Sequence, residues 1–94
     1  MRTIVLASSF KRAFRSLIRR EPEMEAKITD RLELLATDPF DPSLKTHKLK
    51  GKLSGAWACT VEYDCRIVFN FQKHPDSEVE EILLIDIGSH DEVY

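Results

Sequence analysis

The chain has 94 residues, of which 43% are hydrophobic, and a formal net charge of −2 at pH 7. This length and composition indicate one folded domain and exclude a disordered chain, which would contain less apolar material and a stronger charge bias. No stretch approaches the roughly 18 consecutive apolar residues of a membrane span, and two cysteines are too few for a disulfide scaffold or a four-ligand zinc site. We therefore expect a single domain over residues 1–94, located in the cytoplasm and without membrane contact.

Charge is distributed unevenly along the sequence. Residues 2–20 contain six cations, and residues 45–52 contain four lysines and a histidine, with no acid in either segment. The acidic residues are concentrated in residues 21–41 and 76–92. If the fold brought the two basic segments together, they would form a surface for an anionic partner such as nucleic acid.

The N-terminal part of the chain predicts a strand and then a helix. Residues 3–7 are apolar and partly β-branched, which is typical of a strand. Ser8 and Ser9 are candidate N-caps for a helix whose apolar residues recur at helical spacing. These residues are Phe10, Ala13, Phe14, Leu17 and Ile18.

A second helix is expected to begin near Pro22, because proline is favoured in a first helical turn. Pro39 should end it at Asp38, since proline disfavours helical geometry in the residue before it. Its apolar stripe consists of Met24, Ile28, Leu32 and Leu35, with Leu34 beside it. The two helices are expected to form an antiparallel hairpin, followed by a lysine-rich loop over residues 39–55.

Alternating apolar residues on either side of Tyr63-Asp64 predict a β-hairpin. A three-residue loop over residues 62–64 would place all the large apolar side chains on one face, so we expect that register rather than one with a two-residue turn. The predicted pairs are Val61 with Cys65, Cys59 with Ile67, and Trp57 with Phe69.

That register has two consequences. Cys59 and Cys65 would lie diagonally, with Cβ atoms roughly 7 Å apart, which is too far for a disulfide. Thr60 would face Arg66 on the side of the sheet away from the core. An arginine at that position, on an otherwise apolar strand, calls for an anionic partner.

Residues 81–87 are apolar on both faces, as expected of a central strand, and Gly88 ends this run. The predicted order of elements is therefore β-α-α-β-β-β, which is an α+β fold. The sequence contains no internal repeat and no linker.

None of the common catalytic motifs is present: there is no phosphate-binding loop, G-x-S-x-G, H-E-x-x-H or C-x-x-C. The three histidines lack the spacing of metal ligands, so we expect no metal and no cofactor. Metal-free RNA cleavage needs a base for the 2′-hydroxyl, cations for the phosphorane and an acid for the leaving oxygen. His47, Asp64, Arg66, His90 and Tyr94 could supply these functions if the fold gathers them.

Each of these residues also has a purely structural explanation. His47 lies in a segment that would ordinarily be a solvated loop, and Asp64 lies in a tight turn. Arg66 could pair with a carboxylate on the sheet surface. His90 and Tyr94 fall at the end of the sequence, where chains often fray.

Three segments together resemble the RelE/ParE superfamily of type II toxins. They are T-H-K-L-K-G-K-L-S-G-A-W, V-E-Y-D-C-R-I-V-F and L-L-I-D-I-G-S-H-D-E-V-Y. The resemblance covers essentially the whole chain and is closest to the YafQ-like branch of mRNA interferases. It implies a helical hairpin packed on one face of a small curved antiparallel sheet, with the active site on the other face.

The resemblance also implies an activity, namely ribosome-dependent endoribonuclease cleavage of translated mRNA by metal-independent acid–base transesterification. By the same resemblance, the catalytic residues of YafQ-like toxins fall on His47, Asp64 and His90, the arginine that acts on the phosphate falls on Arg66, and the terminal aromatic falls on Tyr94. Lys48, Lys50 and Lys52 are expected to bind RNA.

The implied partners are a cognate antitoxin, the ribosome and mRNA, with operator DNA bound only through the toxin–antitoxin complex. Thr60 stands where YafQ-like toxins carry a further histidine, so either His47 and Asp64 perform the base role alone or activity is reduced. Two alternatives remain. One is a ParE-like DNA gyrase inhibitor, against which His47 and His90 argue, and the other is a catalytically weak toxin that acts mainly in antitoxin-linked operator binding.

Overall fold

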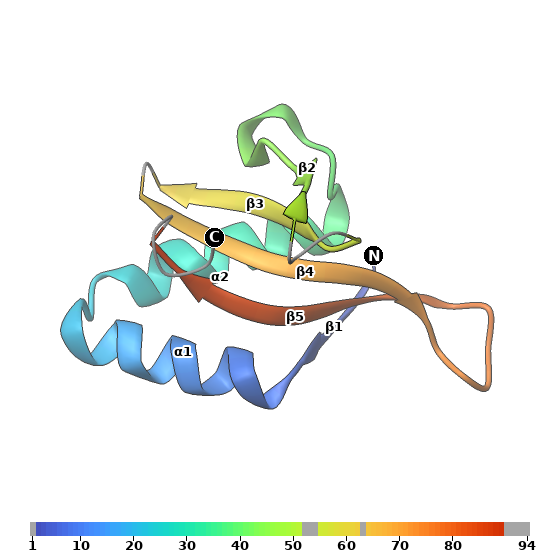
Figure 1. The fold of residues 1–94 in the computed structure, drawn as a ribbon, viewed down its shortest axis with the longest axis horizontal. Helices are drawn as coiled ribbons and strands as arrows, with labels where there is room; N and C mark the ends of the chain where they lie inside the picture. Colours follow the sequence, from blue (N-terminus) through green and yellow to red (C-terminus); the bar gives the residue numbers. More distant parts are fainter. Residues whose placement is uncertain (1, 52–54, 63, 90–94) are drawn as a thin grey trace.

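The computed structural model describes residues 2–51, 55–62 and 64–89. These residues form two α-helices and a five-stranded sheet of order β1-β5-β4-β3-β2 (Figure 1). The elements in chain order are β1 (Thr3–Leu6), α1 (Ser8–Arg20), α2 (Met24–Thr37), the 3₁₀ helix η1 (Pro42–Leu44), β2 (His47–Lys48), β3 (Trp57–Glu62), β4 (Cys65–Lys73) and β5 (Glu80–Gly88). The predicted α+β class is confirmed, and β2 and η1 are additions to the predicted order.

The sheet is antiparallel except at one edge. β5 pairs antiparallel with β4, β4 with β3, and β3 with β2, whereas β1 runs parallel to β5 with Thr3 opposite Glu81. The expectation of a wholly antiparallel sheet is therefore corrected at β1. β5 lies between β1 and β4, which confirms the central position predicted from its two apolar faces.

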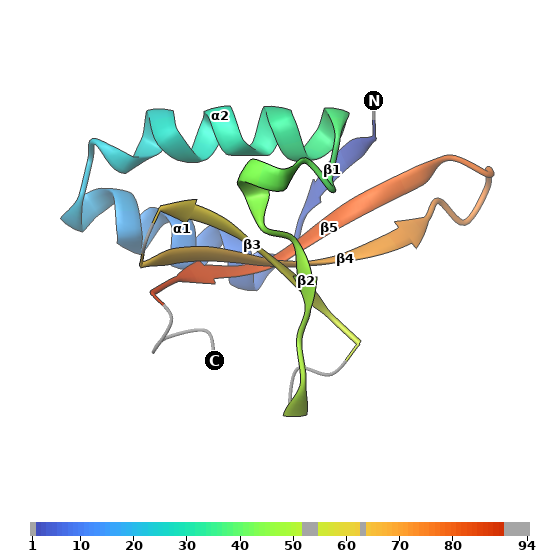
Figure 2. The same cartoon turned by 90° about the horizontal axis from the view of Figure 1, so that it is seen from above.

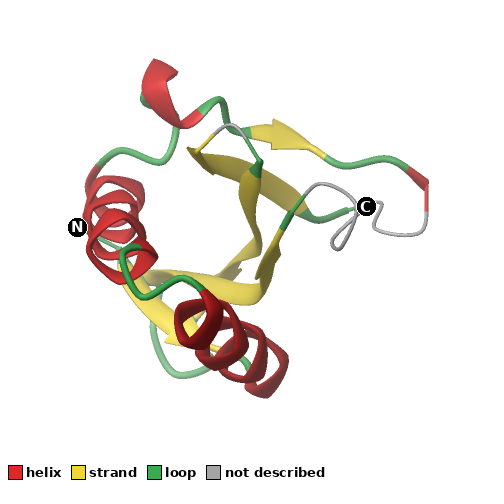
Figure 3. Ribbon diagram, turned by 90° about the vertical axis from the view of Figure 1, so that its left-hand side faces the viewer, coloured by secondary structure: helices red, strands yellow, loops and turns green. Residues whose placement is uncertain are grey.

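Both helices pack on the same face of the sheet (Figure 2). Viewed end-on, the strands form a curved layer beside the helices (Figure 3). The core joins Phe10 and Leu17 of α1 and Ile28 of α2 to the inward side chains of the strands, among which Ile67 and Phe69 are fully buried. α2 also contacts both β1 and β3, which are separated in the sheet by β5 and β4.

The helix boundaries differ in part from the expectation. Ala7, and not Ser8 or Ser9, is the N-cap of α1, and its side chain makes no capping bond. The Ser9 hydroxyl instead donates to the carbonyl of Ile85, which ties the first turn of α1 to β5. α2 begins at Met24 with Glu23 as its N-cap, so Pro22 precedes the helix and does not lie in its first turn as expected. The helix ends at Thr37 with Asp38 as its C-cap, as predicted.

The buried stripe of α2 is also shifted from the expected one. Met24, Ile28 and Leu35 are buried as predicted, but Leu32 and Leu34 are only partly buried and Ala36 is buried instead. Neither helix in the described part of the chain combines the length and the apolar character that a membrane crossing requires.

The β3–β4 register is confirmed up to Thr60, which lies opposite Arg66. Beyond that point the prediction is wrong, because Glu62 and not Val61 pairs with Cys65, with a β-bulge between Thr60 and Glu62. The bulge inserts one extra residue into β3. Because of this residue, the turn stays short while the large apolar side chains remain on the inner face. Val61 and Cys65 are both buried in the core as a result.

Cys59 and Cys65 are both free thiols. Cys59 is completely buried, and this burial raises the pKa of its thiol to about 12. A thiol with such a pKa is protonated near neutral pH and is a poor nucleophile. Cys59 is therefore a core residue.

Candidate active site

The face of the sheet opposite the helices, here called the open face, carries a small apolar cluster. Side chains alternate along a strand, so the inward position of Cys59 and Ile67 turns their neighbours Ala58 and Val68 to the open face. The members of the cluster are Leu49, Ala56, Ala58 and Val68, with Ile85 packed against them. Thr60 and Arg66 follow on the same face, two residues nearer the hairpin turn.

His47 also lies on the open face. It was expected in a loop, but it belongs to β2 and pairs with Ala58 of β3, whose side chain is on that face. Its Nδ1 atom is 2.9 Å from the carbonyl oxygen of Lys45. A carbonyl oxygen only accepts hydrogen bonds, so Nδ1 carries the proton of the neutral ring and Nε2 carries the lone pair. A neutral histidine held in this tautomer has its basic nitrogen at Nε2.

The segment before His47 is held by side-chain hydrogen bonds. Asp41 caps η1 by accepting from the backbone N–H of Ser43 at 2.9 Å and from its hydroxyl at 2.7 Å, and these bonds lower the pKa of the Asp41 carboxyl. The Thr46 hydroxyl donates to the carbonyl of Pro39 at 2.6 Å. The sequence Asp41-Pro42, a capping residue before a proline, is the signal that could have predicted η1.

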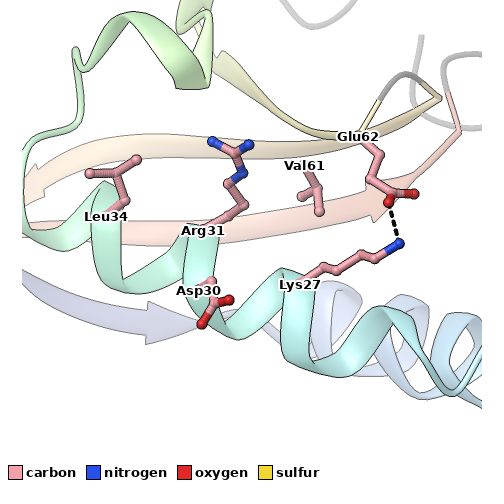
Figure 4. A pocket seen from close by; sticks show the side chains of 6 residues that line it. All are labelled: Lys27, Asp30, Arg31, Leu34, Val61 and Glu62. Carbon is pink, nitrogen blue, oxygen red and sulfur yellow. Dashed lines mark hydrogen bonds and ion pairs between the residues drawn. The ribbon is translucent and has the colours of Figure 1, made fainter.

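Arg31 of α2 joins this segment to the helical layer. It lines a hollow of about 440 Å³ between α2 and β3, together with Lys27 and Glu62, which form an ion pair (Figure 4). The Arg31 guanidinium donates to the Ser43 hydroxyl at 3.2 Å. The position of η1, and with it the start of β2, is thus coupled to α2.

Arg66 and His47 are close enough to act on one group. His47 lies opposite Ala58, and Arg66 lies opposite Thr60, so the two are separated by two strand spacings and two residues. With about 4.8 Å between strands and about 3.3 Å per residue, their Cα atoms are about 12 Å apart. An arginine and an imidazole can both reach a phosphodiester placed between them.

Asp64 lies at the turn between β3 and β4, at the end of the sheet nearer to Arg66. It is exposed, and it lines a hollow of about 330 Å³. The same hollow is lined by Glu21, which is the C-cap of α1, and by Glu62 and Ser89. Ser89 immediately precedes His90 in the sequence. The structure thus brings Asp64 to the hollow that Ser89 also lines. His90 and Tyr94 themselves lie outside the described residues.

Of the three lysines expected to bind RNA, the structure describes Lys48 and Lys50. Lys48 pairs with Trp57, and its Nζ lies 5.4 Å from the centroid of the Trp57 ring, on the side of the sheet that faces the helices. It therefore points away from His47. Lys50 is exposed after the buried Leu49, and Lys52 lies outside the described residues.

The basic segments do not converge. Five exposed cations of the first segment lie on α1, which packs against β5. The second segment contains β2, an edge strand that β4 and β3 separate from β5. The five are Lys11, Arg12, Arg15, Arg19 and Arg20. In the part of the chain that the structure describes, no group of three or more His, Cys, Asp or Glu side chains could hold a metal ion.

The sequence model of one protein family matches residues 2–94, and that family is described as a bacterial toxin of type II toxin-antitoxin system, YafQ. None of the curated proteins compared with the chain matches it.

Solved structures of bacterial toxins share the fold. A metal-bound toxin from Helicobacter pylori is 26% identical over the full length of both chains, with a TM-score of 0.78. YafQ in the DinJ-YafQ complex of E. coli is 21% identical over 100% of this chain and 99% of that one, with a TM-score of 0.75. A YoeB/ParE toxin from Agrobacterium tumefaciens is 22% identical over 94% and 98%, with a TM-score of 0.74.

Proposed function

The chain belongs to the YafQ family of type II toxin–antitoxin toxins, and from that membership we propose that it is a ribosome-dependent endoribonuclease that cleaves translated mRNA. The observation that supports this proposal is the shared open face of His47 and Arg66, a base and a cation about 12 Å apart at Cα. The proposed partners are a cognate antitoxin, the ribosome and mRNA, and operator DNA through the toxin–antitoxin complex. The proposed location is the cytoplasm.

The proposed reaction is a transesterification that uses side chains in place of a metal. The Nε2 lone pair of His47, assisted by Asp64, takes the proton of a 2′-hydroxyl, whose oxygen then attacks the adjacent phosphorus. Arg66, with Lys50 and Lys52, stabilises the charge of the phosphorane. The bond to the 5′-oxygen breaks, leaving a 2′,3′-cyclic phosphate and a 5′-oxygen that requires a proton.

The C-terminal residues complete the proposed reaction. His90 donates the proton to the leaving 5′-oxygen, and Tyr94 stacks on or orients a base, as aromatic side chains do with unpaired RNA. Ser89, which precedes His90 in the sequence, lines the same hollow as Asp64. Thr60 faces Arg66 and cannot take up a proton near neutral pH, so the base role falls to His47 and Asp64.

The test is cleavage of a defined mRNA on programmed ribosomes, with toxin that has been treated with a chelator and desalted before the assay. We expect cleavage within the codon in the ribosomal A site, with 2′,3′-cyclic phosphate and 5′-hydroxyl ends. Ends of the opposite type, or activity that returns only when metal is added back to the toxin, would contradict the mechanism. Intact mRNA together with inhibited DNA supercoiling would identify a gyrase inhibitor instead.

A further inference from the structure

Three side chains link α2 to the segment that leads into β2. The guanidinium of Arg31 donates to the Ser43 hydroxyl at 3.2 Å, and this hydroxyl donates to the Asp41 carboxylate at 2.7 Å. The backbone N–H of Ser43 donates to the same carboxylate oxygen at 2.9 Å. A cation and an anion are thus joined through one hydroxyl. Hydrogen bonds to charged groups are stronger than those between neutral groups, so this Arg31–Ser43–Asp41 link is a firm one.

The link acts on η1, the short 3₁₀ helix that precedes β2. Asp41 is the N-cap of η1, and Lys45 is its C-cap with a φ of 52°. The carbonyl oxygen of Lys45 lies 2.9 Å from Nδ1 of His47. The direction of this carbonyl depends on the orientation of η1. Whatever fixes η1 therefore also fixes a hydrogen-bond partner of the His47 ring.

Arg31 provides the side-chain tie between η1 and the helical layer. Leu44 is fully buried, which fixes one point of η1 in the core but not the rotation of η1 about that point. Among the described residues, the other hydrogen bonds of residues 41–46 begin and end within residues 38–47. The bonds from Arg31 to Ser43 are the exception. They add a second fixed point, which together with the pairing of β2 and β3 sets the orientation of η1.

The charges of the link support the same assignment. The two bonds from Ser43 lower the pKa of the Asp41 carboxyl, and the positive charge of Arg31 lowers it further. Lys27, the other cation of α2, pairs with Glu62 instead, across the hollow that both cations line (Figure 4). Arg31 is therefore the cation of α2 that acts on η1, and Lys27 offers a matched comparison one turn away.

We propose that Arg31 and Ser43 are positioning residues for His47. By orienting η1, they fix the carbonyl of Lys45, which keeps the imidazole proton on Nδ1 and the lone pair on Nε2. The inference rests on the proposed function, in which His47 is the base. It gives α2 a role in the active site although α2 packs on the opposite face of the sheet from His47.

The first experiment measures the tautomer of His47 from imidazole ¹⁵N chemical shifts at a pH where the ring is neutral. Arg31→Met keeps the apolar stem of the side chain but removes the guanidinium, and it should change a single Nδ1–H tautomer into a mixture. Ser43→Ala removes the hydroxyl between the two charges and should do the same. Lys27→Met should leave the tautomer unchanged. An unchanged Nδ1–H tautomer in both Arg31→Met and Ser43→Ala would overturn the proposal.

Two comparisons separate positioning from a general loss of stability. Ser43→Thr keeps a hydroxyl and should restore the single tautomer that Ser43→Ala loses. The double variant Arg31→Met/Ser43→Ala should shift the tautomer no further than either single variant, because both changes break the same link. Additive shifts would contradict the link. Ser43 is exposed, so Ser43→Ala removes no core packing and decides the question even if Arg31→Met does not fold.

The second experiment measures single-turnover mRNA cleavage over a range of ribosome concentrations. Arg31→Met and Ser43→Ala should slow the rate at saturation by about ten- to hundredfold, because a small misplacement of a reacting group costs this much. The half-saturating concentration should stay the same, and Lys27→Met should cleave at the normal rate. A shift in the half-saturating concentration alone would show that Arg31 contacts the ribosome and would overturn the positioning role.

The two experiments distinguish failure of this inference from failure of the proposed function. A shifted tautomer with a normal cleavage rate would overturn the positioning role and leave the ribonuclease standing. If the unchanged chain cleaves no mRNA, the proposed function fails. The ¹⁵N spectra then still show whether Arg31 and Ser43 control the His47 ring, since they require no activity.

Discussion

The Nδ1 atom of His47 lies 2.9 Å from the carbonyl oxygen of Lys45, and Lys45 is the one non-glycine residue with positive φ, 52°, in the part of the chain that the structure describes. The left-handed conformation ends η1 and aims this carbonyl at the imidazole. The orientation of the proposed base therefore depends on a backbone conformation that L-residues adopt at a cost.

The first prediction concerns that conformation. Lys45→Gly should be well tolerated because glycine adopts positive φ freely, whereas the β-branched Lys45→Val should be less stable than Lys45→Gly by about 1–2 kcal/mol. Urea denaturation measures the difference. Imidazole ¹⁵N spectra should show the His47 proton on Nδ1 in the glycine variant and a mixture of tautomers in the valine variant. Equal stability of the two variants would mean that residue 45 is not held at positive φ in solution.

A second prediction separates the lysines near His47. Lys48→Met should change mRNA cleavage little, because Lys48 lies over the Trp57 ring on the side away from His47. Lys50→Met removes an exposed cation and should weaken RNA binding. Single-turnover cleavage on programmed ribosomes compares the two variants. A larger loss for Lys48→Met would show that Lys48 leaves Trp57 when RNA binds.

Local patterns predicted the central hairpin but not its irregularity. The alternation around Cys59 and Ile67 selects one register, because a shift by one residue would expose the whole apolar face. Position 61 is different. A longer loop and a bulge both bury Val61, so the pattern does not distinguish them. The opposition of Thr60 and Arg66 was predictable because it follows from the part of the register that both solutions share.

Pairings between distant segments were not predictable in the same way. β2 has two residues, too few to show a period, so His47 was assigned to a loop and its face of the sheet could not be inferred. β1 pairs with β5 across nearly the whole sequence, and a local pattern carries no information on the direction of such a pairing. The motif resemblance named His47, but only the β2–β3 pairing places it on the face of Arg66.

The third prediction is a pH dependence of stability from Cys59. Burial raises the pKa of this thiol to about 12 from its ordinary value of 9.0. The folded state then holds its proton more tightly than the unfolded state, so the contribution is complete below about pH 9 and is lost as the pH rises from 9 towards 12. At pH 10 the loss should be on the order of 1 kcal/mol, one pH unit of linkage.

Cys59→Ala provides the control for this effect, since alanine fills a similar buried position without a titratable group. The stability difference between pH 8.5 and pH 10, measured by urea denaturation, should be larger for the unchanged chain than for Cys59→Ala. Identical pH profiles would show that the thiol ionises in the folded state as easily as in the unfolded state. Cys59→Ser should be less stable than the unchanged chain at pH 8.5, because it buries a hydroxyl.

A fourth prediction tests the cations of α1 as contacts to ribosomal RNA. Arg12, Arg15 and Arg19 are exposed and follow one another at spacings of three and four residues, which places them along one side of the helix. Each replacement by alanine should weaken ribosome binding and reduce the slope of log affinity against log salt concentration by about 0.7–0.9, if each neutralises one phosphate.

Lys73→Ala is the matched control for the charge. Lys73 pairs with Glu78 at 3.3 Å at the far end of β4, so its loss removes one cation without touching α1. The salt slope of this variant should equal that of the unchanged chain. A slope reduced as much by Lys73→Ala as by the α1 variants would mean that total charge, and not the α1 surface, governs ribosome binding.

The last prediction concerns the proposed acid and base. His90→Ala and His47→Ala should each slow single-turnover cleavage on programmed ribosomes by roughly two to four orders of magnitude, the contribution of a positioned acid or base. Antitoxin binding should be retained in both; His47 is exposed on a two-residue strand, so its replacement should leave the core intact. Circular dichroism should confirm the fold of each variant. Near-normal rates in both folded variants would exclude the acid–base assignment even if the chain still arrested growth.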